Sequence, residues 1–187
     1  MQHSWTRRGV IAALPALAAT AGCTTVSGSQ ARGQKIDSRV DAAFSYLYQN
    51  VPGAQDLASR SVGILMMPLI TEAGLGFGGA YGRGALRIGG ATVDYYAAAS
   101  GSFGLQIGAQ QYAHALFFLT EDALARFRSS AGFSVGGDLE VAVASSGVAY
   151  TADTTTTTEP IVAMIFGQAG LIAGATLEGT KYTRIYP

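Results

Sequence analysis

Two glycine-spaced motifs in this sequence are the first candidates for chemistry. The run Gly74–Gly79 (GLGFGG) has the G-x-G-x-x-G spacing of nucleotide sites, and Asp94 follows about 20 residues later, where a ribose-binding acid would stand. Such a site needs its last glycine to begin a helix that holds the pyrophosphate. Here more glycine follows, without a helical period. We therefore predict no nucleotide site in this run.

The second motif is Gly132–Gly136 (GFSVG), which has the G-x-S-x-G spacing of a nucleophile elbow. That elbow requires a strand, a sharp turn and then a helix, but Ser134 stands between a helical and a strand-like segment. In that fold the histidine also follows the serine, whereas His114 precedes it. We interpret His114 as a hydrogen-bonded core residue. We predict that the protein is not an enzyme, with no catalytic residues and no cofactor.

The sulfur and nitrogen ligands of a transition-metal site are scarce. The chain has one cysteine and two histidines, and one of these histidines stands in the first few residues. No Cys/His cluster of metal-binding type can be assembled from so few ligands. The sequence therefore predicts no metal site, and the single cysteine, Cys23, cannot form an intramolecular disulfide.

The first 22 residues have the layout of a signal peptide. Arg7 and Arg8 precede an uncharged run, Gly9–Ala21, which is too short to span a bilayer comfortably. The residues up to Cys23 (TAGC) resemble the lipobox of bacterial lipoproteins, in which the cysteine is acylated, for example by palmitate, and becomes the mature N-terminus. A secretory signal that ends near a stray cysteine is the alternative. The two arginines leave both twin-arginine and Sec export open.

The lipobox resemblance implies a location. Thr24 follows the cysteine, and an Asp there would favour retention in the inner membrane. We therefore expect a protein of the bacterial envelope, lipid-anchored on the periplasmic face of the outer membrane. Residues 24–33 are rich in Ser, Thr, Gly and Gln, so we predict that residues 23–35 are the lipidated cysteine and a flexible tether.

The charge balance limits the partners. The chain has 12 basic and 12 acidic residues, and removal of the segment with Arg7 and Arg8 leaves 10 basic residues against 12 acidic ones. A nucleic-acid binder needs a clear basic excess, so we predict no nucleic-acid partner. Any attraction to anionic lipid must come from a local patch.

The clearest amphipathic helix is predicted over Ile36–Asn50, where apolar residues recur at helical spacing up to Val51-Pro52-Gly53. Basic residues gather at its start and are partly offset by Asp37 and Asp41. Two interpretations remain open: a helix packed on a sheet with solvated charges, or a membrane-facing helix with cations near lipid head groups. The basic residues are Arg32, Lys35 and Arg39.

The remaining chain predicts mostly strands. Residues 101–119 alternate apolar and small or polar residues and predict two strands back to back. The glycine density of residues 74–90 favours twisted strands with close backbone contacts. Thr120 predicts the N-cap of a helix that ends near Ser129. Further strands are predicted over residues 61–67 (ended by Pro68), 92–99, 133–144, 161–166, 170–178 and 182–186.

Short connections favour antiparallel pairing. We therefore predict an α+β fold over residues 36–187: a curved antiparallel sheet or barrel-like β core, with an N-terminal amphipathic helix and one further helix. Closing the sheet would also remove its exposed edges.

Three glycine-rich segments occur in a characteristic order: Gly104–Ala109 (GLQIGA), Val135–Ala142 (VGGDLEVA) and Gly170–Gly179 (GLIAGATLEG). Together they resemble the SYLF, or Ysc84-like, lipid-binding domain family in its bacterial lipoprotein branch. The resemblance implies binding to anionic phospholipids through the N-terminal helix, which here carries Arg32, Lys35 and Arg39. Some eukaryotic members bundle actin, a partner that we do not expect in a bacterial envelope.

Two functions are compatible with these observations. The first is a lipid-anchored envelope protein whose SYLF-like domain binds membrane phospholipid without catalysis. The alternative is a structural lipoprotein that acts as a protein–protein interaction module in the periplasm, with an envelope protein as its partner. A lipid-binding module should adsorb to vesicles without its anchor, in a salt-sensitive way. A protein-binding module should not.

Overall fold

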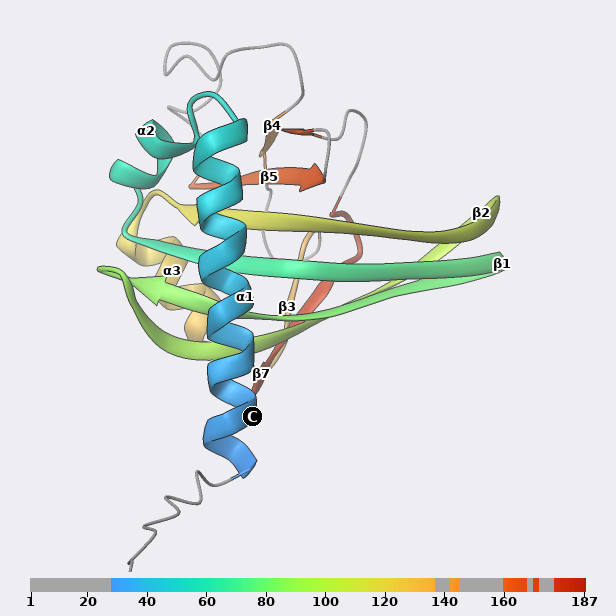
Figure 1. Cartoon of the computed structure of the whole chain (residues 1–187), viewed down its shortest axis with the longest axis horizontal. Coiled ribbons are helices and arrows are strands. Elements are labelled where there is room, and N and C mark those ends of the chain that lie inside the picture. Colours follow the sequence, from blue (N-terminus) through green and yellow to red (C-terminus); the bar gives the residue numbers. More distant parts are fainter. Residues whose placement is uncertain (1–27, 137–141, 145–159, 168–169, 172–176) are drawn as a thin grey trace, which may run out of the picture.

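The computed structural model describes residues 28–136, 142–144, 160–167, 170–171 and 177–187. Three helices and seven strands are present in this part of the chain (Figure 1). The helices are α1 (Gly28–Asn50), α2 (Ala54–Ser59) and α3 (Glu121–Ser129). The strands are β1 (Gly63–Ile88), β2 (Ala91–Phe118), β3 (Phe133–Ser134), β4 (Ala142–Ala144), β5 (Ile161–Gly167), β6 (Gly170–Leu171) and β7 (Lys181–Ile185).

The strands form one curled sheet with the order β3-β7-β2-β5-β4, to which β1 adds by pairing with β2 and β6 by pairing with β5. The described pairs are antiparallel except for β4 with β5. The prediction of an α+β fold with a curved sheet, an N-terminal helix and a further helix is thus confirmed.

The framework of the sheet is a single long hairpin of β1 and β2. Pairing runs from Gly63 opposite Phe118 to Ile88 opposite Ala91, and Gly89 and Gly90 form the turn with φ of 57° and 83°. The predicted break at Pro68 is wrong, because a register shift between Met67 and Ile70 accommodates the proline within β1.

The predicted division of the second strand is also wrong. β2 is continuous over Ala91–Phe118, where we expected one strand over residues 92–99 and two more over residues 101–119. Its whole length has a partner strand in β1, so no turn is needed between the predicted segments. A register shift between Leu75 and Gly76 lies within this long pairing.

The hairpin folds back on itself, so that the two halves of β1 lie against each other (Figure 1). Glycine is required where they meet. A Cβ on Gly82 would lie 2.4 Å from the carbonyl oxygen of Leu69, and one on Gly84 would lie 2.0 Å from that of Met66. The close backbone contacts predicted for this glycine-rich region are confirmed.

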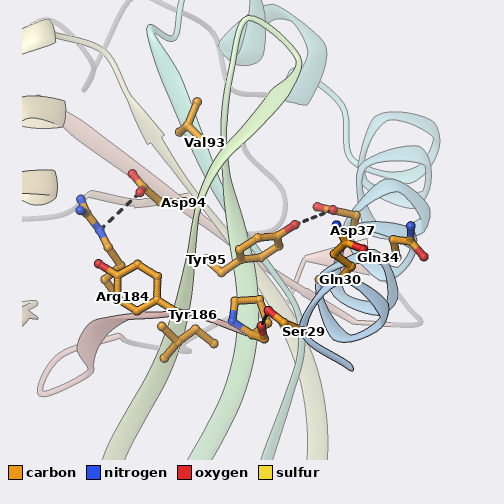
Figure 2. Close-up of a pocket in the computed structure, with 12 residues that line it drawn as sticks. Ser29, Gln30, Gln34, Asp37, Val93, Asp94, Tyr95, Arg184 and Tyr186 are labelled. Carbon is orange, nitrogen blue, oxygen red and sulfur yellow. Dashed lines mark hydrogen bonds and ion pairs between the residues drawn. The ribbon is translucent and has the colours of Figure 1, made fainter. Parts of the chain in front are cut away.

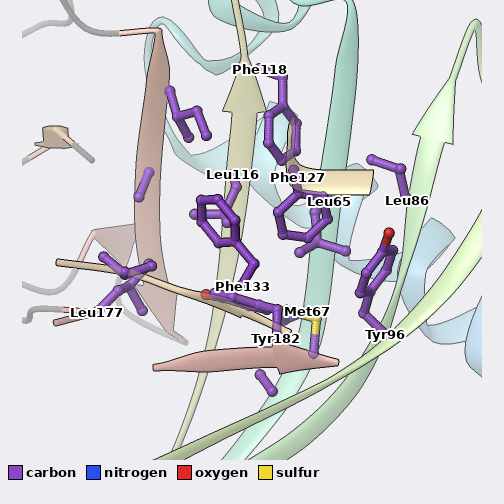
Figure 3. Close-up of a cluster of buried hydrophobic side chains, with 14 of the residues drawn as sticks. Leu65, Met67, Leu86, Tyr96, Leu116, Phe118, Phe127, Phe133, Leu177 and Tyr182 are labelled. Carbon is purple, nitrogen blue, oxygen red and sulfur yellow. The ribbon is translucent and has the colours of Figure 1, made fainter. Parts of the chain in front are cut away.

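The sheet is buried on both sides. On one side α1 and α2 pack Val40, Leu47 and Leu57 against a cluster that includes Phe117 and Met164. On the other side Phe127 of α3 lies among Phe118, Phe133 and Tyr182 (Figure 3). Thr120 caps α3, because its hydroxyl accepts a hydrogen bond from the Ala123 amide at 3.3 Å.

His114 lies in this second cluster, as predicted. It is 1 % exposed, and its Nε2 is 2.7 Å from the hydroxyl of Tyr182. Burial lowers the pKa of His114 to about 3, so the ring is neutral and serves the core.

The N-terminal boundary of α1 differs from the prediction. The helix begins at Gly28, not at Ile36, so residues 28–35 are helical and are not part of a tether. Tertiary contacts explain the extension. Ser29 donates a hydrogen bond to the carbonyl of Pro187, and Gly33 packs so closely on Tyr95 that a Cβ would lie 3.1 Å from its hydroxyl. Cys23 and the predicted signal peptide lie outside the described residues.

Parts of two predicted strands, at residues 137–141 and 172–176, also lie outside the described residues, as do residues 145–159 and 168–169. Among the described helices, none combines the length and apolar character needed to cross a membrane.

Candidate functional site

The predicted cationic residues Arg32, Lys35 and Arg39 come together on one side of α1. Their spacing of three and four residues places them on neighbouring turns of one face. All three are exposed. Within the described part of the chain, no ion pair or side-chain hydrogen bond is formed by any of them. We call these three residues the basic row.

The acidic residues of α1 lie on the other flank, which is docked on the hairpin. Asp37 accepts a hydrogen bond from the hydroxyl of Tyr95 at 2.7 Å (Figure 2). It accepts a second one from the hydroxyl of Thr92, also at 2.7 Å. Arg87 lies 2.6 Å from Asp41 and 3.7 Å from Asp37. Strand residues thus pair with both acids, and Arg87 compensates part of their charge, so they offset the basic row less than the sequence suggested. We call Asp37 and Asp41 the acidic flank.

The pKa of Tyr95 reflects this docking. Burial raises it to about 12, with smaller contributions from the hydrogen bond to Asp37 and from the charge of that carboxylate, while Arg87 opposes them. Tyr95 therefore stays protonated across the physiological range and can keep donating its hydrogen bond to Asp37.

A pocket of about 620 Å³ opens between the start of α1, β2 and the C-terminal residues (Figure 2). Its charged groups are paired with one another or with neighbours. Asp94 lies 2.9 Å from Arg128 and 3.4 Å from Arg184, and Asp37 is bound by Tyr95. The charged groups of this pocket therefore serve to hold α1 against the sheet, and we do not regard the pocket as a candidate ligand site.

A second cavity, of about 400 Å³, lies beside the basic row. We call it the α1 groove. It runs between α1, the irregular stretch of β1 at Pro68, β2 and the end of β5. Most of its walls are apolar or small side chains, and Arg39 is the cationic residue in its lining. The lining is Arg39, Ala42, Ala43, Tyr46, Pro68, Leu69, Gln111, Tyr112, Ala113, Phe166 and Gly167.

The two glycine-spaced motifs form no site in the described residues. Gly74–Gly79 lies inside β1, with no helix behind it, and Asp94 is paired with arginines. Ser134 lies in β3 opposite Lys181, and the His114 Nε2 is bonded to Tyr182. Among the described residues, no group of three or more His, Cys, Asp or Glu side chains is placed to hold a metal ion.

Comparison with known families supports the resemblance seen in the glycine-rich segments. The family model Ysc84, described as Las17-binding protein actin regulator, matches residues 99–185. Residues 99–185 are therefore similar to a Ysc84 (SYLF) domain. This Ysc84-like region runs from within β2 to the end of β7 and does not include α1. No curated protein matches the chain.

The α1 groove and the partners of the acidic flank were not predicted from the sequence. The partners of Asp37 are about 55 residues away, at Thr92 and Tyr95, and only the folded hairpin brings them to the helix. The one local signal for the groove was the pair Ala42–Ala43, whose small side chains leave space beside the helix.

Proposed function

We propose that this protein is a non-catalytic, lipid-anchored envelope protein that binds anionic phospholipid through the basic row. The observation that carries the proposal is the exposed, unpaired state of Arg32, Lys35 and Arg39 within the described structure. Basic residues near an anionic membrane surface contribute about 1 kcal/mol each. The Ysc84-like region supports this function through the family resemblance.

The distribution of the other charges favours this face of the molecule. Arg60, Arg87, Arg126, Arg128 and Arg184 each have an acidic partner within 4 Å, whereas Arg83 on β1 and Lys181 on β7 have none among the described residues. The positive charge of the five paired arginines is therefore largely compensated locally. The basic row concentrates uncompensated charge on one helix flank, where it can attract phosphate groups even though the whole chain has no net charge.

The proposed anchor lies close to this flank. Cys23 precedes the first residue of α1, Gly28, by only five residues. An acyl group on Cys23 would hold the start of α1 near a bilayer, at the periplasmic face of the outer membrane of a bacterial envelope. The acyl anchor would keep the protein attached to the membrane, and the basic row would orient the domain on the membrane surface. Neither nucleic acid nor actin is a partner in this proposal.

The test is vesicle co-sedimentation of residues 24–187, which lack the acylated cysteine. We expect binding to anionic vesicles that falls with salt, and much weaker binding to neutral vesicles. The double variant Lys35→Glu/Arg39→Glu should lose binding to anionic vesicles by at least tenfold, because it removes two attractive charges and adds two repulsive ones.

The matched control is Arg83→Glu/Arg126→Glu, which makes the same change in net charge at exposed residues of β1 and α3. This control should bind almost as well as the parent protein. Equal losses in the two double variants would mean that net charge alone matters. An absence of binding to either vesicle would contradict the proposal and would favour an envelope protein as the partner.

A further inference from the structure

We propose that the α1 groove takes one acyl chain of the anionic phospholipid whose phosphate is held by Arg39. The proposal rests on the proposed function and adds to it. The row alone predicts adsorption to the surface of a bilayer. The groove predicts that a single lipid molecule is bound, with its chain partly withdrawn from the bilayer.

The lining of the groove suits a hydrocarbon chain. Ala42 and Ala43 form a low wall on α1, Leu69 faces it from β1, and Ala113 and Phe166 contribute from the sheet. Ala43, Ala113 and Phe166 are buried, whereas Ala42 is exposed. An acyl chain that covered these surfaces would remove apolar area from water, at about 25 cal/mol per Å².

Two of the polar side chains that line the groove, Tyr46 and Gln111, already have partners. The hydroxyl of Tyr46 donates to the carbonyl of Gly167 at 2.6 Å, and the ring of Tyr46 stacks on Phe166 with the centroids 6.0 Å apart. The Gln111 amide lies 3.5 Å from the Thr71 hydroxyl. An apolar guest would therefore leave none of these groups without its partner, and a polar guest would gain little from them.

Arg39 gives the groove its charge complementarity. Its guanidinium has no acidic partner within the described residues, and it belongs to both the groove lining and the basic row. A guanidinium binds phosphate in a bidentate, charge-assisted way. The arrangement thus offers one anion site at one apolar groove, which is the chemistry of an anionic amphiphile.

The experiment uses the full chain with Cys23→Ser and dihexanoyl phosphatidylglycerol below its micelle concentration. Calorimetric titration should show saturable binding of one lipid per chain, and glycerophosphoglycerol, the head group without chains, should bind at least tenfold more weakly. Dihexanoyl phosphatidylcholine, which has the same chains and no net charge, should also bind more weakly. Arg39→Gln should reduce the difference between the two lipids.

A substitution in the groove separates this inference from the proposed function. Ala42→Trp places an indole over the groove, and we expect monomeric lipid to bind at least tenfold more weakly while salt-sensitive adsorption to anionic vesicles remains. Ser45→Trp, on the exposed side of the same helix, is the matched control and should leave both intact. Far-ultraviolet circular dichroism and thermal melting should confirm that both variants fold.

Equal binding of monomeric lipid by the parent chain and Ala42→Trp would overturn the groove as an acyl site. Binding of the head group alone as tightly as the lipid would also overturn it. Either result, with vesicle adsorption retained, would leave the proposed function intact and assign the groove to a different occupant, such as a segment of a protein. If the parent chain does not adsorb to anionic vesicles, that result would instead contradict the proposed function.

Discussion

The two flanks of α1 carry charges of opposite sign, and they differ in whether those charges are paired with the rest of the fold. On the acidic flank, Asp37 is bound by Tyr95 and Thr92, and Asp41 is paired with Arg87. On the other flank, the basic row is exposed and has no described partner. One helix thus uses its acids to hold the fold together and leaves its bases available for a ligand.

This difference explains how a protein with no net charge can have a cationic surface. If Asp37 and Asp41 were free to move, they would screen the basic row from the same helix. The hairpin instead holds them on the far flank, with Arg87 neutralising part of their charge. The positive charge of the basic row is therefore not cancelled by acidic side chains on the same flank of the helix.

The largest effect on stability should follow from breaking the docked flank with Asp37→Ala. The change removes the acceptor of two hydrogen bonds and an ion-pair partner of Arg87, and we expect a loss of about 2–3 kcal/mol in the free energy of unfolding. Urea denaturation at neutral pH measures it. Vesicle binding by the folded variant should be retained, because the basic row is untouched.

The matched control is Asp41→Ala. The Asp41 side chain is 67 % exposed, so its ion pair with Arg87 should contribute about 0.5 kcal/mol. Equal destabilisation by both variants would show that Asp37 is not the main contact. A folded Asp37→Ala variant that no longer binds vesicles would show that the two flanks are not separable in function.

The sequence predicted those features that depend on near neighbours. The helical period of α1, the Thr120 cap of α3 and the strand at β5 follow from local patterns, and the glycine-rich region indicated close backbone contacts. The basic row was found because its members are close in sequence.

Features that depend on distant contacts were missed or misplaced. The early start of α1 depends on Pro187 and Tyr95, and the strand through Pro68 depends on pairing with β2. The α1 groove is built from four elements, so no single segment carries its pattern. The separation of the acidic flank from the basic row likewise needs the folded hairpin.

A fall in pH should act on the core rather than on the docked flank, because the core contains the buried His114. His114 should dominate the loss of stability. Its pKa is about 3 in the buried site and about 6.5 in an unfolded chain, so the unfolded state binds more protons between these values and stability falls as pH falls. From pH 6.5 to pH 5 we expect a loss of about 1.6 kcal/mol in the free energy of unfolding.

Urea denaturation at several pH values measures this slope. His114→Gln should flatten it over that range, since Gln cannot gain a proton and can still bond to the Tyr182 hydroxyl. Asp37→Ala should lower the free energy of unfolding at every pH without changing its slope with pH. If the pH dependence of the free energy of unfolding disappears in Asp37→Ala and persists in His114→Gln, the loss of stability in acid arises from the docked flank and not from His114.

The smallest effect, and the most direct view of the docked flank, is the titration of Tyr95. Its pKa of about 12 predicts that the stability contributed by the protonated phenol is complete below pH 10 and is lost as pH rises towards 12. The absorbance difference at 295 nm between the parent protein and Tyr95→Phe isolates this group. Asp37→Asn should lower the pKa of Tyr95 but leave it above 10, because burial is the larger cause.

A Tyr95 that titrates at its ordinary pKa of 10 would mean that the flank is undocked in solution. Asp37 and Asp41 would then be free to screen the basic row, and the charge argument for lipid binding would lose its basis.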